Sequence, residues 1–162
     1  MNQHVAVAAL SVWLIASSPW LGMLRRVPAN ASWVDYTHVA LGFVSLVLAL
    51  TYTWSCVREA RWRLYFPVVP PQSGGLRDDL AGLLRGRLPA AEGGGLFGLI
   101  EGLVLLALVL TALSGGAWFL AQGGTTALGW RAAHIHVAHW LIVLLVLHVV
   151  TVSLHLLDFV RD

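Results

Sequence analysis

Four long stretches of the chain contain no Asp, Glu, Lys or Arg, and this feature constrains the fold more than any other. They cover residues 1–24, 36–57, 102–130 and 132–157. A helix needs about 20 apolar residues to cross a hydrocarbon core about 30 Å thick, and each stretch is long enough. Only 11% of the residues are charged, whereas a soluble domain carries about a quarter. The sequence therefore predicts an all-α membrane protein rather than a soluble globular fold.

We expect one domain, residues 1–162, folded as a four-helix transmembrane bundle. The expected helices cover about 4–24, 36–57, 96–121 and 132–157, with a loop over about 58–95. Inside that loop, apolar residues recur at helical spacing between Leu76 and Leu88. This pattern predicts a short amphipathic helix that lies on the membrane surface.

The arginines predict the orientation of the bundle. Six of them lie in the loop 58–95, two lie between the first two spans, and one, Arg131, lies between the last two. Short loops rich in Lys and Arg face the cytoplasm, so we expect this loop and both termini to be cytoplasmic. The same loop also carries four acidic residues, so the basic cluster is not a nucleic-acid-binding surface.

Seven histidines stand out in so apolar a chain, because ionisable side chains at membrane depth are costly and tend to mark function. His38 lies three residues after Asp35 and His134 three after Arg131, which puts both near the outer ends of their spans. His148 follows His134 by fourteen residues, so the two differ by about 40° around the helix and stand roughly 21 Å apart along it. His4 lies near the inner end of the first span. An outer pair and an inner pair of imidazoles are what two bis-histidine haems require.

Small residues support this interpretation, because a flat macrocycle needs room beside each helix. Gly42 and Ala138 follow His38 and His134 by one helical turn. A zinc site is a weaker hypothesis. His136 and His139 point about 200° and 140° away from His134, so the three cannot converge from one helix.

These residues resemble a known family. The segment Asp35-Tyr-Thr-His38-Val-Ala-Leu-Gly42, the segment Arg131-Ala-Ala-His134 and the later His148 and His155 are similar to the bacterial cytochrome b561 family. They also resemble the cytochrome b (gamma) subunits of membrane-bound formate dehydrogenases and nickel-iron hydrogenases. The resemblance implies two haem b groups, with the iron of the outer one held by His38 and His134 and that of the inner one by His4 and His148. It also implies a multi-pass protein of the bacterial inner membrane.

The inner ligands leave alternatives open. His155 shares the face of His148 and could replace it as the ligand, or it could meet a quinone or a haem propionate. Glu101, near the cytoplasmic surface, could accept a quinol proton, although a carboxylate is also favoured there by a helix N-terminus. If His4 does not bind iron, a single outer haem remains.

The leading functional hypothesis is an electron-transfer subunit. Such a di-haem cytochrome passes electrons between the quinone pool of a respiratory chain and a redox partner subunit, and the partner supplies the substrate chemistry. One alternative is a stand-alone cytochrome b561 that acts as a superoxide:quinone oxidoreductase. Another is a haem-free membrane anchor in which the histidines are incidental.

Overall fold

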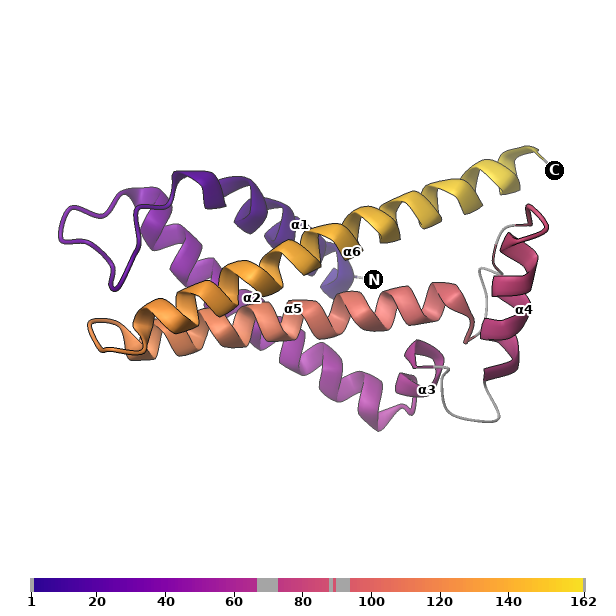
Figure 1. Ribbon diagram of the computed structural model, residues 1–162, viewed down its shortest axis with the longest axis horizontal. Helices are drawn as coiled ribbons and strands as arrows, with labels where there is room; N and C mark the ends of the chain where they lie inside the picture. The colour runs from indigo at the N-terminus through magenta and orange to yellow at the C-terminus, as the bar shows by residue number, and fades with distance from the viewer. Residues whose placement is uncertain (1, 67–72, 88, 90–93, 162) are drawn as a thin grey trace. The chain divides into compact units, whose positions relative to one another are not determined.

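The protein is all-helical in the part that the computed structural model describes, which is residues 2–66, 73–87, 89 and 94–161, without the side chains of 2, 73, 74 and 155–161. Figure 1 labels the α-helices, and the elements are numbered in chain order. They are α1 (Asn2–Ser17), the short 3₁₀ helix η1 (Ser18–Trp20), α2 (Trp33–Arg58), α3 (Trp62–Tyr65), α4 (Ser73–Leu83), α5 (Leu96–Ala121) and α6 (Ala127–Arg161).

Three of these helices are long and apolar enough to cross a membrane. They are α2, α5 and residues Ala127–Leu154 of α6. The bounds of α5 agree with the predicted 96–121. Compared with the predicted 36–57, α2 begins three residues earlier, at Trp33. The last helix begins at Ala127 instead of 132, because the break before it is confined to the turn at 122–126. Gly123 in that turn has a φ of 81°, a left-handed conformation that favours glycine.

The first helix ends earlier than its apolar sequence predicts. The expected helix 4–24 stops at Ser17, and Pro19 lies in the single 3₁₀ turn that follows. Proline has no N–H to continue the helical ladder, and its ring clashes with the preceding turn, so the chain leaves the helix here. At about 1.5 Å per residue, the 16 residues of α1 reach about 24 Å. On its own, α1 is therefore shorter than a hydrocarbon core.

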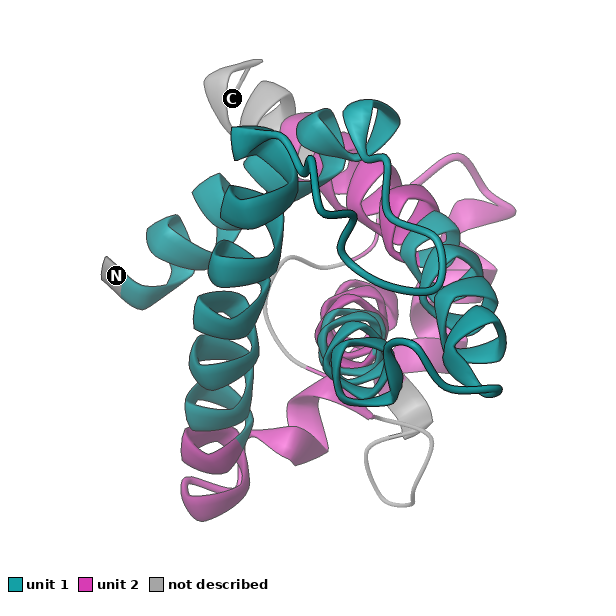
Figure 2. Cartoon of the chain, turned by 90° about the vertical axis from the view of Figure 1, so that its left-hand side faces the viewer, with its two compact units in different colours: residues 1–53, 107–140 teal, residues 54–106, 141–162 magenta. Residues whose placement is uncertain are grey.

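The chain divides into two compact units, coloured separately in Figure 2. Unit 1 consists of residues 1–53 and 107–140, and unit 2 of residues 54–106 and 141–162. Unit 1 holds α1, most of α2, the second half of α5 and the start of α6. His4, His38 and His134 belong to unit 1, and His148 belongs to unit 2.

In unit 1, the start of α2 is fixed by a reciprocal cap. The backbone N–H of Asp35 donates to Ser32 Oγ at 3.3 Å, while Asp35 Oδ2 accepts the Ser32 backbone N–H at 2.9 Å and its hydroxyl at 2.8 Å. This is a capping box, which satisfies helix-end donors that would otherwise lack partners. The other carboxylate oxygen accepts the backbone N–H of Gly22 at 3.0 Å. Asp35 is buried, and it sets where α2 begins one turn before His38.

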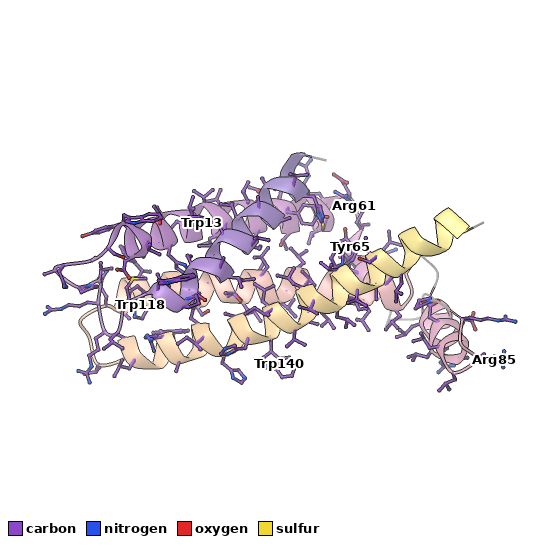
Figure 3. The ribbon with its side chains drawn as sticks, turned by 90° about the horizontal axis from the view of Figure 1, so that it is seen from above. Trp13, Arg61, Tyr65, Arg85, Trp118 and Trp140 are labelled. Atoms are coloured by element: carbon purple, nitrogen blue, oxygen red, sulfur yellow. The ribbon has the colours of Figure 1, made fainter. Side chains whose placement is uncertain are left out.

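The loop between η1 and α2 is tied to α5 and α6 through its backbone. Three consecutive carbonyls, of residues 23–25, accept hydrogen bonds. The donors are Arg131 Nε at 2.8 Å, Trp118 Nε1 at 2.9 Å and the Gly123 N–H at 2.8 Å, in that order. Trp118, labelled in Figure 3, is buried, and with Met23 and Ala127 it forms a small apolar core under the loop.

In unit 2, α4 is joined to the first turn of α5. The amphipathic helix expected over 76–88 is found, displaced toward the N-terminus. Asp79 on α4 is buried, and its Oδ2 accepts the backbone N–H of Leu96 at 2.8 Å. A Cβ at Gly95 would occupy the place of this carboxylate oxygen, so the contact requires glycine there. Leu80, Leu83 and Leu84 of this region remain exposed, Leu84 by 92%.

Candidate haem-ligand site

His38 lies one turn into α2, where a buried serine from α1 faces its ring. The Nδ1 atom of His38 is 3.1 Å from Ser17 Oγ. Ser17 Oγ also lies 3.2 Å from the carbonyl oxygen of Leu14, to which the hydroxyl donates. While that hydrogen is directed to Leu14, the Ser17 oxygen can accept a hydrogen bond from the Nδ1–H tautomer of His38.

His134 lies near the start of α6 and has a similar environment, built by α5. Its Nδ1 is 2.8 Å from the carbonyl oxygen of Thr111 and 3.4 Å from Ser114 Oγ. Ser114 is buried, and its hydroxyl donates to the same carbonyl at 2.9 Å. A carbonyl oxygen can only accept, so Nδ1 of His134 carries the hydrogen.

The surroundings of both rings suit the same tautomer, which the Thr111 carbonyl requires for His134 and the Ser17 hydroxyl accommodates for His38. In a neutral imidazole only one nitrogen carries a hydrogen, so with Nδ1 donating, Nε2 keeps its lone pair. Histidines that bind metals usually donate their other ring N–H to a backbone carbonyl or another oxygen, which fixes the ring and raises its basicity. His134 has this arrangement with the Thr111 carbonyl, and Ser17 Oγ is positioned to give it to His38.

The two histidines also lie near each other within unit 1. Their rings are close enough for a charge on one to act on the other. The side of Gly42 where a Cβ would project has no atom within 4 Å, so open space adjoins this part of α2, one turn after His38. Ala138, one turn after His134, is half-buried. On the α5 side, the His134 ring rests against Gly115, where a Cβ would lie 3.1 Å from both Cε1 and Nδ1.

The other two histidines of α6 in unit 1 point elsewhere, as their helical positions predict. His136 and His139 are exposed, whereas His134 is half-buried. Trp140, which is 57% exposed and projects from α6 in Figure 3, donates its indole N–H to His136 Nε2 at 3.3 Å. These side chains do not converge with His134.

The predicted inner ligands belong to separate units. His4 is exposed on α1, beside Gln3, whose side chain donates to the Leu48 carbonyl at 3.1 Å and so holds the start of α1 against α2. His148 is half-buried in unit 2, and its ring centroid is 6.0 Å from that of Phe97. An inner pair of His4 and His148 stays a prediction.

Glu101 and His155 are the two residues predicted to contact a quinone or a haem propionate near the inner haem. Glu101 is half-buried on α5 within unit 2. His155 lies on α6, but its side chain is outside the described part of the structure. Their contact with a quinone or a haem propionate stays a prediction.

Sequence reasoning missed Ser17, Ser114 and Gly115. Serine and glycine are common in apolar helices, where they let helices pack closely, so none of the three stands out alone. A usable signal was the spacing: Ser17 precedes His38 by 21 residues, and Ser114 precedes His134 by 20.

Comparison with known proteins identifies no relative of this chain. No family model, no curated protein and no solved structure matches the chain.

Proposed function

We propose that the chain is a b-type membrane cytochrome in which His38 and His134 hold the iron of a haem from opposite sides. The observation that carries this proposal is the shared surroundings of the two rings. Each has an oxygen of a neighbouring helix within hydrogen-bonding distance of Nδ1, and this supports Nε2 as the coordinating atom. Their proximity within one unit, and the open space beside Gly42, support the fit of a flat group.

The number of ligands favours haem over a bare metal ion. A porphyrin supplies four nitrogens itself, so the protein needs to add only one or two axial ligands. A zinc site takes three or four protein ligands. Within the described ranges of the chain, no group of three or more His, Cys, Asp or Glu residues is placed to hold a metal ion.

The wider proposal follows the expected topology. The chain is a four-helix bundle in a bacterial inner membrane, with both termini cytoplasmic and with α1 and η1 together completing the first span. A second haem b nearer the cytoplasm completes this proposal. Glu101 and His155 lie toward that side, where a carboxylate and an imidazole can exchange protons with a quinone.

In this function the haem supplies the one-electron redox chemistry. The residues of the chain orient two imidazoles, keep their ring hydrogens on Nδ1, and surround the site with apolar helices that exclude water. Electrons pass between the quinone pool and a redox partner subunit. The apolar character of α2, α5 and α6 supports a location in the membrane.

A haem count on the purified chain tests the proposal. The chain is produced in membranes with ample haem, extracted in mild detergent, and measured by the pyridine haemochrome assay and a reduced-minus-oxidised spectrum. We expect His38→Ala and His134→Ala each to lose the same haem. His136→Ala is the matched control, because His136 is an exposed histidine two residues from His134, and we expect it to keep the full haem content.

Three outcomes would contradict the proposal. A wild-type chain without b-type bands would indicate a haem-free anchor. Full haem content in both ligand variants would show that other residues hold the iron. An equal loss in His136→Ala would show that the assay responds to any histidine on α6.

A further inference from the structure

Two helical hairpins of unit 1 build the same local arrangement around their histidines. In the first, Ser17 on α1 faces His38 on α2. In the second, Ser114 on α5 faces His134 on α6. Each serine is buried, and each donates its hydroxyl hydrogen to the carbonyl three residues before it. The spacing from serine to histidine is 21 residues in one hairpin and 20 in the other.

The two arrangements differ in what accepts the ring hydrogen. For His38 the acceptor is Ser17 Oγ at 3.1 Å. For His134 the Thr111 carbonyl accepts at 2.8 Å, and Ser114 Oγ is more distant at 3.4 Å. Loss of the Ser17 hydroxyl therefore removes the acceptor that faces His38, whereas loss of the Ser114 hydroxyl leaves the shorter bond of His134 in place.

We propose that Ser17 is a positioning residue that fixes the tautomer of His38 and lowers the reduction potential of the haem bound there, and that Ser114 has only a minor part in the same task. This inference rests on the proposed function. A hydrogen bond from Nδ1–H raises the basicity of an imidazole ligand, and a more basic ligand stabilises the oxidised iron. Removing the acceptor of His38 raises the potential.

The test compares Ser17→Ala with Ser114→Ala in the full-length, haem-loaded chain by spectroelectrochemical titration. We expect Ser17→Ala to retain the low-spin bis-imidazole spectrum, and its equilibrium constant for reduction to increase about tenfold, which is 59 mV for a one-electron couple. We expect Ser114→Ala to titrate close to wild type. Any second haem in the chain serves as an internal reference whose potential does not move.

A second pair of variants separates the hydroxyl from packing. Threonine and valine have nearly the same shape, and threonine alone has a hydroxyl. We expect Ser17→Thr to keep the wild-type potential and Ser17→Val to shift it as Ser17→Ala does. This pair also decides the matter if the alanine variant does not fold.

The outcomes distinguish this inference from the proposed function. Equal potentials for wild type, Ser17→Ala and Ser17→Val, all with haem bound, would overturn the role of Ser17 and leave the haem proposal standing. Equal shifts of the reduction potential in Ser17→Ala and Ser114→Ala would overturn the claim that Ser17 contributes more than Ser114. A wild-type chain that binds no haem would refute the proposed function and this inference with it.

Discussion

Gly115 is the residue of α5 against which the ring of His134 rests, and its replacement by alanine tests how tightly that ring is held. A Cβ at position 115 would lie 3.1 Å from both Cε1 and Nδ1 of His134. Such a contact is shorter than normal van der Waals distance, so the ring or α5 must move by a few tenths of an ångström. Moving the ring also lengthens its hydrogen bond to the Thr111 carbonyl, now 2.8 Å.

Gly116 provides a matched control on the same helix. A Cβ there would meet Leu46 Cδ2 and Phe43 Cε1 at 3.9 Å, which is ordinary contact. Replacing a helical glycine with alanine gains about 0.8–1 kcal/mol from helix propensity at either position. Overpacking costs about 1–3 kcal/mol, and only Gly115→Ala incurs it. Because the propensity gain cancels between the two variants, Gly115→Ala should be less stable than Gly116→Ala by about 1–3 kcal/mol.

The assay is denaturant-induced unfolding of both variants in detergent micelles without haem, followed by helical circular dichroism. Haem content is then measured after loading, since displacement of His134 should also reduce binding of a group held by that ring. Two variants of equal stability and equal haem content would refute the packing argument, because the His134 ring would then have room to move away at no cost.

Two further substitutions test the contacts that hold each unit together. Asp79→Ala removes the acceptor of the Leu96 N–H at the first turn of α5, and should lower the free energy of unfolding by about 0.5–2 kcal/mol. Faster hydrogen exchange at the start of α5 would locate the change, and unchanged exchange there would contradict it. Trp118→Phe keeps an aromatic ring in the core but loses the donor to the Leu24 carbonyl, which should cost about 0.5–1.5 kcal/mol in chemical denaturation. Trp130→Phe, at an exposed tryptophan, should leave stability unchanged, and equal losses in the two tryptophan variants would argue against a role for the hydrogen bond.

The bounds of a helix could be predicted from the sequence where the residues that end the helix lie next to it in the chain. Three glycines precede Leu96 and a left-handed glycine follows Ala121, so hydropathy and turn chemistry agreed on the bounds of α5. They disagreed for α1, where the apolar run continues to Leu24 although the backbone leaves the helix before Pro19. A prediction from hydropathy depends only on the side chains, whereas proline ends the helix because its backbone has no N–H.

Only those features of the candidate site that depend on spacing within one helix could be predicted from the sequence. Helical spacing separated His134 from His136 and His139, and their burial in the structure agrees with that separation. The oxygen that faces each ring comes from a different helix, so its identity depends on how α1 packs on α2 and α5 on α6. That information lies in tertiary contacts, and for this reason Ser17 and Ser114 were not foreseen.

Positions 23–25 of the loop are held by their peptide carbonyls. Many residues could replace the exposed Leu24 and Arg25 without loss of an acceptor, whereas Met23 also packs in the core with Trp118. The two side-chain donors have less freedom, because each replacement must place an N–H at the same carbonyl. Natural or engineered diversity should therefore accumulate at positions 24 and 25, while Trp118 and Arg131 resist replacement.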